Sequence, residues 1–374
     1  MEEGKITHSR EFRARRAQNW IVLGTTYAMF YMGRYNLSLA SPDMVSQYGW
    51  DSKDLGFVMG LGSFIYAISM LINGPWADRI GGKKAILFGA LGVFAMNAFF
   101  ALGSLFTAYS YFLFVWAVNN YFQSFGAISI VKVNAAWFVV RERGVFSAIF
   151  GTMIQGGRLL IFALGGYLIA RYSWPTVFII PSVCVLVMYF LTRIYVKDTP
   201  QEAGYPALDT QDATSGDTEE VKFSYLAKRV FTNPIMITIA LAEFCTGFLR
   251  KGIDDWFTLY MTQHHGVERD SFLFQFTAQG MGVGSIVGAI LAGVLSDKLF
   301  QSRRAPMAVI YYAMAAVLLA VFSFVKDPWM QASLLVLLSL AITGCHSLLS
   351  GTASMDFGGK KAAASAAAMF DGCQ

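Results

Sequence analysis

Two arginines stand inside long apolar runs of the sequence, Arg34 near the N-terminus and Arg250 in the second half of the chain. A guanidinium at the centre of a bilayer costs about 2.5–3.5 kcal/mol on insertion scales, so such a residue is expected to face a protein interior or a water-filled cavity. The planar guanidinium can donate two parallel hydrogen bonds to an oxyanion, a geometry that suits phosphate better than a lysine ammonium does. The two residues therefore predict a buried anion-binding site.

The neighbours of Arg34 support an inward-facing side chain. Tyr27, Tyr31, Arg34 and Ser38 recur at helical spacing, so they share one stripe of a helix. The two tyrosines are candidate lining residues of the site, and their alternative role is packing or interfacial anchoring. The only acid of this run is Asp43, near its far end.

Arg250 has the same arrangement in a second apolar run. Glu243, Thr246, Arg250 and Asp254 follow the same helical spacing. A fixed pairing of Arg250 with Glu243 or Asp254 is the alternative to anion binding. If the two runs occupy equivalent places, the guanidiniums of Arg34 and Arg250 face each other at similar depth.

Two further ionisable residues lie in apolar runs, Lys132 and His346. Lys132 lies about two turns from one end of its run, so it could pair with a charge at the membrane surface. His346 could offer a protonatable group to a phosphate near neutral pH, or it could be a hydrogen-bonded packing residue.

The composition identifies the elements that must position these side chains. The 374 residues are 55% hydrophobic and 14% charged, whereas soluble domains carry roughly 25% charged residues. We therefore expect an all-α polytopic membrane protein, in which each span needs about 20 apolar residues. The predicted spans are 18–46, 54–76, 85–107, 111–138, 145–170, 174–195, 235–261, 271–296, 305–325 and 329–352, and a further apolar stretch begins near Ala362.

Basic residues are distributed unevenly about these spans. Twenty of the 29 lysines and arginines fall on the side of the N-terminal arm and four on the opposite side. Because cytoplasmic loops carry an excess of Lys and Arg, the N-terminus is predicted to be cytoplasmic. The same excess accounts for the formal net charge of +5, so we expect a lipid bilayer as the surroundings and no nucleic-acid partner.

Several features recur across the polar stretch 197–234 at an offset of 216–219 residues. Arg34 corresponds to Arg250, Asp78 to Asp297 and Arg143 to Lys361. Six spans separate the equivalents, so the two halves are predicted to be parallel repeats. The predicted organisation is an N-terminal arm 1–17, a six-helix half 18–196, a cytoplasmic linker 197–234 and an incomplete second half 235–374.

These motifs resemble those of the major facilitator superfamily and, within it, of the organophosphate:phosphate antiporter family of glycerol-3-phosphate and hexose-6-phosphate transporters. The resemblance implies a bundle of two parallel-repeat halves with twelve helices, of which about ten are present before the chain ends. The matching segments are Gly74-x-x-x-Asp78-Arg79-x-Gly81-Gly82-Lys83-Lys84, Tyr31-x-x-Arg34-x-Asn36, Lys53-Asp54-Leu55-Gly56-Phe57, Glu142-Arg143-Gly144, Asp198-Thr199-Pro200-Gln201-x-x-Gly204-x-Pro206, Arg250-x-Gly252-Ile253-x-Asp255-Trp256-x-x-x-Tyr260 and Lys360-Lys361-Ala362-Ala363.

The resemblance implies that a monomer in the bacterial inner membrane exchanges a small organophosphate for inorganic phosphate by alternating access. Arg34 and Arg250 would bind the phosphate, with Tyr27, Tyr31, Lys132 and His346 as further substrate-binding candidates. Glycerol-3-phosphate transporters of the family have a Lys where this chain has Met70 and a His where it has Met153. Because both cationic residues are absent here, the resemblance does not identify the organophosphate. The alternatives are a membrane sensor that binds a sugar phosphate without transporting it and a transporter of another organic anion.

Four charged residues at the predicted cytoplasmic ends of the spans are candidates for a gate. In the superfamily such loops form charged latches, and the alternative is the ordinary basic excess of cytoplasmic loops. Asp78 is the strongest candidate, with Arg143 or another loop cation as its partner. The four residues are Asp78, Arg79, Arg143 and Asp297.

The sequence contains none of the common catalytic or cofactor-binding patterns. No Walker or dinucleotide fingerprint, no H-E-x-x-H, no G-x-S-x-G and no metal-ligand spacing of Cys and His is present. We therefore expect neither an enzyme nor a cofactor or metal site.

Overall fold

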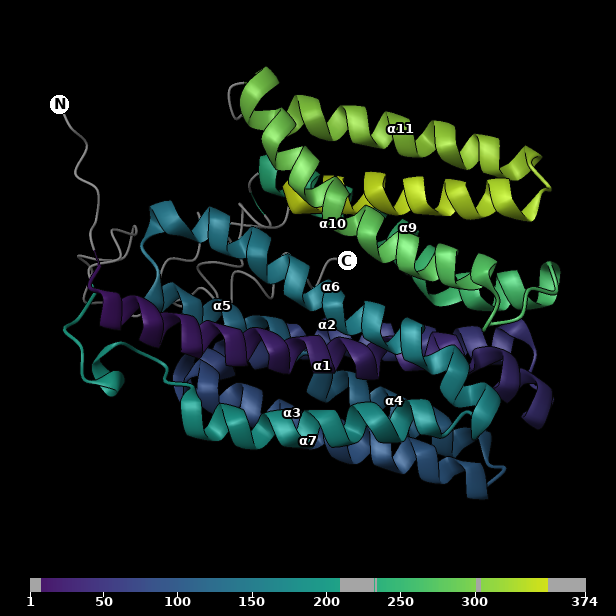
Figure 1. Ribbon diagram of the computed structural model, residues 1–374, viewed down its shortest axis with the longest axis horizontal. Coiled ribbons are helices and arrows are strands. Elements are labelled where there is room, and N and C mark those ends of the chain that lie inside the picture. Colours follow the sequence, from purple (N-terminus) through teal and green to yellow (C-terminus); the bar gives the residue numbers. More distant parts are fainter. Residues whose placement is uncertain (1–7, 209–231, 233, 301–303, 349–374) are drawn as a thin grey trace.

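The computed structural model describes residues 8–208, 232, 234–300 and 304–348, and these are almost entirely helical (Figure 1). The stretch beginning near Ala362 lies outside the described residues. Short turns connect some of the helices at η1 (Gly103–Leu105), η2 (Gln201–Ala203) and η3 (Tyr260–His264). The helices are α1 (Arg10–Tyr48), α2 (Ser52–Ile80), α3 (Gly82–Leu102), α4 (Tyr109–Gln123), α5 (Phe125–Trp137), α6 (Val140–Arg171), α7 (Thr176–Tyr195), α9 (Pro234–Leu259), α10 (Phe272–Phe300), α11 (Arg304–Phe324) and Pro328–Leu348.

The first helix begins earlier than the sequence predicts. α1 starts at Arg10, inside the predicted arm 1–17. The Ser9 hydroxyl accepts a hydrogen bond from the backbone N–H of Phe12 at 3.1 Å, which caps the helix. The Phe12 ring then packs against the rings of Trp137 and Tyr205, with centroids 5.8 and 5.3 Å away. This aromatic contact anchors the first turns of α1 to the bundle.

The predicted span 111–138 is divided into α4 and α5 at Ser124. The Ser124 hydroxyl donates to the carbonyl oxygen of Tyr121 at 2.7 Å and accepts from the Asn73 amide at 2.8 Å. A hydroxyl that bonds back to the preceding turn competes with the helical ladder and bends the helix. The break therefore has a local polar cause within an apolar run.

Within the described part of the chain, six helices are long and apolar enough to cross a membrane by length and composition. The other predicted spans contain polar positions: α1 carries Arg34, α9 carries Arg250, α6 carries Arg158, and α4 and α5 are pieces of 15 and 13 residues. The six apolar helices are Ser52–Ile80, Gly82–Leu105, Thr176–Tyr195, Phe272–Phe300, Ala305–Phe324 and Pro328–Leu348.

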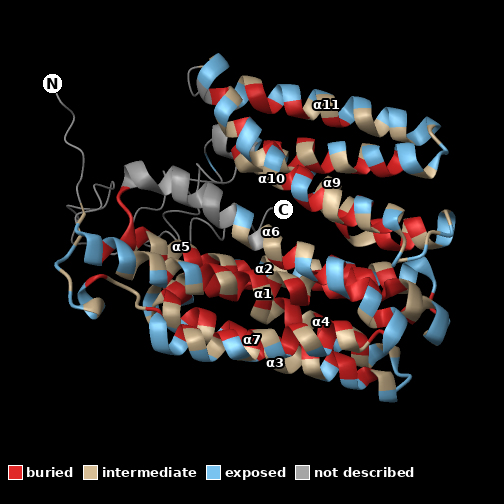
Figure 2. Ribbon diagram, in the orientation of Figure 1, coloured by how far each residue is buried: buried red, intermediate tan, exposed pale blue. Residues whose placement is uncertain are grey.

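Exposed residues lie along the outward faces of the helices (Figure 2), and many of them are large and apolar. Phe64, Phe114 and Phe324 are 62%, 67% and 85% exposed. Large apolar side chains exposed in this number are unfavourable in water and are expected of helices that face lipid.

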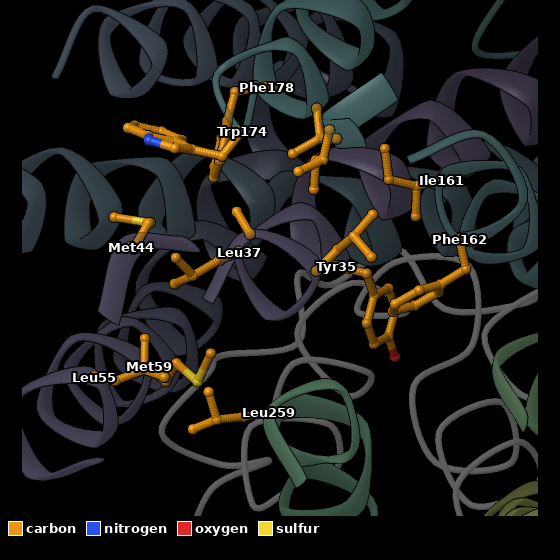
Figure 3. Close-up of a cluster of buried hydrophobic side chains, with 14 of the residues drawn as sticks. Tyr35, Leu37, Met44, Leu55, Met59, Ile161, Phe162, Trp174, Phe178 and Leu259 are labelled. Atoms are coloured by element: carbon orange, nitrogen blue, oxygen red, sulfur yellow. The ribbon is translucent and has the colours of Figure 1, made fainter. Parts of the chain in front are cut away.

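We call α1–α7 the first helix group and α9 to Pro328–Leu348 the second. The two groups meet where α1 packs on α9 and α6 packs on α10. One apolar cluster continues across this boundary: Leu259 of α9 belongs to the same cluster as Leu55 and Met59 of α2 (Figure 3). The rings of Phe162 in α6 and Phe257 in α9 also lie 5.1 Å apart. The predicted domain boundaries and the duplication of the halves stay predictions.

Close helix contacts inside the bundle rely on glycine. A Cβ at Gly157 of α6 would lie 1.8 Å from the carbonyl oxygen of Ala28 in α1, so only glycine permits this approach. This close contact holds α6 against the stretch of α1 that carries Arg34 and the two tyrosines predicted to line the site.

Candidate functional site

Polar side chains from both helix groups line a cavity of about 120 Å³, which we call the central cavity. α1, α2 and α4 contribute from the first group, and α9 and the helix Pro328–Leu348 contribute from the second. The lining residues are Tyr27, Tyr31, Arg34, Tyr35, Ser63, Tyr66, Ala67, Asn120, Arg250, Lys251 and His346.

Arg34 is held in the central cavity by aromatic rings and one amide. Its guanidinium carbon lies 4.8 Å from the ring centroid of Tyr31 and 4.7 Å from that of Tyr66. One terminal nitrogen is 3.5 Å from the amide oxygen of Gln123, and the buried Nε has no hydrogen-bond partner. Among the described residues no carboxylate forms an ion pair with Arg34. The guanidinium therefore retains donors for an anion.

Arg250 lines the same cavity from the opposite helix group. The two acids of its stripe, Glu243 and Asp254, act on it electrostatically. Asp254 also forms an ion pair with Arg158 at 2.8 Å, and Oε2 of Glu243 lies 3.1 Å from Nδ1 of His346. Anion binding by Arg250 and its pairing with one of these acids both stay predictions.

Five of the six predicted substrate-binding residues line the central cavity: Arg34, Arg250, Tyr27, Tyr31 and His346. The rings of Tyr27 and Tyr31 make an edge contact with centroids 5.2 Å apart. Their common placement agrees with the predicted helical stripes, and their binding roles stay predictions.

Lys132 does not line this cavity. Its ammonium lies 2.9 Å from the carboxylate of Asp78, and the two side chains are 20% and 12% exposed. The pair joins α5 to α2 near the end of α2, so the structure favours the pairing interpretation of Lys132 over substrate contact. Asp78 thus has a lysine partner within its own helix group.

The other predicted gate residues are less informative. Arg79 is exposed at the end of α2. Arg143 in α6 and Asp297 in α10 lie where the side chains are outside the described part of the structure. A latch built on these residues stays a prediction.

Six lining residues were not predicted: Tyr35, Ser63, Tyr66, Ala67, Asn120 and Lys251. Lys251 follows Arg250 directly and forms an ion pair with Asp255 at 3.1 Å. Its charge in an apolar run was the available signal. Those on α2 and α4 carry no charge, so nothing in the sequence indicated which face of these helices is turned inward. Tyr35 follows Arg34 on α1 but lies off the predicted stripe of this helix.

The segment that follows α7 is fixed to the start of α3. The carboxylate of Asp198 accepts a hydrogen bond from the backbone N–H of Lys83 at 2.6 Å, next to Gly81 with φ of 92°. A carboxylate at a helix N-terminus is favourable because unpaired N–H groups point toward it. Burial nevertheless raises the pKa of Asp198, although the Lys83 hydrogen bond opposes that rise.

The two helix groups are bonded together on the side of the cavity toward the C-terminal end of α1. The Ser38 hydroxyl donates to the carbonyl oxygens of Asp254 and Asp255 at 3.1 and 2.9 Å. Arg269, just before α10, donates to the Asp43 carboxylate at 2.8 Å through one of its terminal nitrogens. The contacting residues of α1 all follow Arg34, so these bonds close the bundle on one side of the site.

Comparisons with known proteins agree with this architecture. The family model of the Major Facilitator Superfamily matches residues 23–374. The chain also resembles a solved structure of a bacterial homologue of the human lysosomal transporter Spinster, with a TM-score of 0.69 and 14% identity over 98% of this chain and 81% of that one. The predicted fold class is confirmed.

Three curated relatives each cover most of the chain. A glycerol-3-phosphate transporter of Bacillus subtilis is 28% identical over 96% of this chain and 82% of its own length. The membrane sensor protein UhpC of Salmonella typhimurium is 28% identical over 96% and 83%. A hexose-6-phosphate:phosphate antiporter of Escherichia coli is 27% identical over 92% and 76%.

These relatives are membrane transport and sensor proteins, not enzymes. The helical bundle, its apolar surface and the family match identify a multi-pass integral membrane protein. The chain belongs to the major facilitator superfamily.

Proposed function

We propose that this protein is a secondary transporter that exchanges a small organophosphate for inorganic phosphate across the bacterial inner membrane. The observation that carries the proposal is the central cavity itself, in which one arginine from each helix group meets a common space. Two guanidiniums that line one cavity can bind a phosphate from two sides. The similarity to glycerol-3-phosphate and hexose-6-phosphate transporters supports a phosphorylated sugar or glycerol as the second substrate.

Exchange follows from the charge of the empty site. Without an anion, Arg34 and Arg250 place two positive charges beside one cavity, and their mutual repulsion disfavours conformational change. A bound phosphate compensates both charges, so the loaded protein changes between its inward-facing and outward-facing states more readily than the empty protein does. The consequence is coupling of one anion's entry to another's exit.

Alternating access requires that the cavity open to one side at a time. The bonds from Ser38 and Arg269 close the side toward the end of α1. With the N-terminus cytoplasmic, as the basic residues predict, that closed side is the external one. The helix groups then rock about the central cavity and break these bonds when the site opens outward.

Flux measurements in vesicles test the proposal. Vesicles containing the purified chain and loaded with inorganic phosphate are expected to take up labelled glycerol 3-phosphate or glucose 6-phosphate, and phosphate-free vesicles are not. Arg34→Lys and Arg250→Lys should each abolish uptake, whereas Arg171→Lys, at the exposed end of α6, should retain it. Wild-type uptake by either cavity variant would refute the proposal.

A sensor is the second candidate, because a membrane sensor protein is as similar to this chain as a transporter is. A sensor would use the same cavity to bind a sugar phosphate without releasing it on the other side. Binding of the labelled sugar phosphate to the purified protein without any vesicle flux would favour this function over exchange.

A further inference from the structure

A second, smaller space adjoins the central cavity, and we call it the side pocket. Four residues line both spaces: Arg34, Ser63, Asn120 and Lys251. Asp255 lines only the side pocket. The side pocket has a volume of about 10 Å³, against about 120 Å³ for the central cavity. A space of this size holds a group about as large as one water molecule, so it suits a hydroxyl group and is too small for a phosphate.

The side pocket lies on the closed side of the bundle. Leu37 and Ser38, which follow Arg34 on α1, belong to its wall. The Ser38 hydroxyl also donates to the backbone carbonyl oxygen of Asp255 at 2.9 Å, which is one of the bonds between the two helix groups. A ligand bound by Arg34 therefore has the side pocket next to it, toward the C-terminal end of α1.

An ion pair of α9 supplies the side pocket with donors and acceptors. Nζ of Lys251 lies 3.1 Å from Oδ2 of Asp255 and 3.2 Å from its Oδ1. An ammonium has three N–H donors and a carboxylate accepts about four hydrogen bonds, so this contact leaves hydrogen-bonding capacity on both groups. Because the two charges cancel, the pair does not select a second anionic group. A hydroxyl can accept from Lys251 and donate to Asp255, so it matches the pair.

The first helix group supplies the opposite wall of the side pocket. Asn120 of α4 donates its amide N–H to the carbonyl oxygen of Trp116 at 2.9 Å, which fixes the orientation of the amide. The Trp116 side chain and Ser63 of α2 line the same space. A group in the side pocket therefore contacts polar side chains of both helix groups.

We propose that the side pocket binds a hydroxyl group of the transported organophosphate while its phosphate occupies the central cavity. Lys251 and Asp255 are the specificity-determining residues, and Ser63 and Asn120 complete the site. The organic substrates are therefore organophosphates with a hydroxyl close to the phosphate, and phosphate esters of plain alkyl chains bind more weakly. The inference rests on the proposed function, because it requires a phosphate in the central cavity.

Two phosphate esters that differ only in their hydroxyls test the side pocket. Displacement of labelled inorganic phosphate from the purified chain gives the dissociation constants of glycerol 3-phosphate and propyl phosphate. The wild type should bind glycerol 3-phosphate about tenfold or more tightly, since hydrogen bonds to charged groups contribute strongly to affinity. Lys251→Met and Asp255→Leu should each lower this ratio severalfold, whereas Lys326→Met, changed at an exposed lysine, should keep it. Both esters carry the same phosphate, so a change in cavity charge cancels in the ratio.

The outcomes separate the two proposals. Equal affinity of the wild type for the two esters, or an unaltered ratio in folded Lys251→Met and Asp255→Leu, overturns the hydroxyl site and leaves the proposed function intact, because phosphate still binds. A wild type that binds neither inorganic phosphate nor glycerol 3-phosphate overturns both. A melting curve shows which variants fold. Ser63→Ala removes only one hydroxyl and should lower the ratio in the same direction, so it keeps the test decisive if the other two variants fail to fold.

Discussion

The guanidinium of Arg158 lies 2.8 Å from the carboxylate of Asp254, and the two side chains are only 1% and 5% exposed. Arg158 belongs to α6 and Asp254 to α9, so this ion pair joins the two helix groups. The hydroxyl of Tyr35 donates to the same carboxylate at 3.1 Å, which extends the connection to α1. A buried, hydrogen-bonded pair of this kind holds the groups in one relative position.

We predict that Asp254→Asn strongly destabilises the protein. Removing one partner of a buried pair leaves an uncompensated charge and costs about 3–5 kcal/mol. The melting temperature in detergent should fall well below that of the wild type. Asp327→Asn, in the short connection before Pro328–Leu348, serves as the control and should melt near the wild type.

A double variant distinguishes charge from packing. Arg158→Gln combined with Asp254→Asn removes both charges, so its loss of stability should be smaller than the sum of the two single losses. Equal melting temperatures for Asp254→Asn and the wild type would contradict the role of this pair.

The ring of Tyr66 contributes to the position of Arg34. Cation–π contacts are worth about 0.5–2 kcal/mol, so Tyr66→Ala should weaken phosphate binding by about 2- to 30-fold through lost preorganisation. Tyr66→Phe keeps the ring and should bind within a few-fold of the wild type. Equilibrium dialysis with labelled phosphate measures the affinity of both variants. Unaltered affinity in Tyr66→Ala would show that the ring does not position Arg34 for phosphate binding.

Lys132 should affect the transport cycle more than phosphate affinity. Because its ammonium is bound to Asp78 and does not line the central cavity, Lys132→Gln is expected to keep the dissociation constant for phosphate within about twofold. Its flux in vesicles should change, since a contact near the end of α2 is lost. A loss of phosphate affinity as large as that of Arg34→Lys would indicate instead that Lys132 contacts the substrate.

The carboxyl group of Asp198 should make stability depend on pH. Burial raises the pKa of Asp198 in the folded protein, so the folded state binds more protons than the unfolded one, and stability falls as pH rises above about 4. The melting temperature of the wild type should therefore fall relative to that of Asp198→Asn as pH increases toward 7. Glu268→Gln, changed at an exposed residue before α10, retains Asp198 and should follow the wild type at every pH. A constant difference in melting temperature between the wild type and Asp198→Asn across this pH range would contradict the account.

The sequence predicted the cavity residues that carry charge or lie on a charged stripe, with the exception of Lys251. Arg34 indicated the inward face of α1, and the helical spacing placed Tyr27 and Tyr31 on that face. Tyr66 could not, because α2 has no central charge to define which face is turned inward. Ser63 of α2 could not be predicted for the same reason.

Other features depended on contacts between distant segments. The early start of α1 comes from Phe12 packing on Trp137 and Tyr205, which no local pattern contains. The partner of Lys132 was ambiguous because depth in the membrane does not determine which neighbouring helix supplies the countercharge. Its neighbour Asp78 became evident only when α2 and α5 were placed together.

Binding of inorganic phosphate to the purified protein tests the central claim most directly. Labelled phosphate should bind the wild type and Arg171→Lys with similar affinity, because the control retains both cavity arginines. Arg34→Lys and Arg250→Lys should each lose most of this binding while melting at temperatures near the wild type. Folded Arg34→Lys or Arg250→Lys protein that binds phosphate as tightly as the wild type would contradict the claim that the two guanidiniums share one anion.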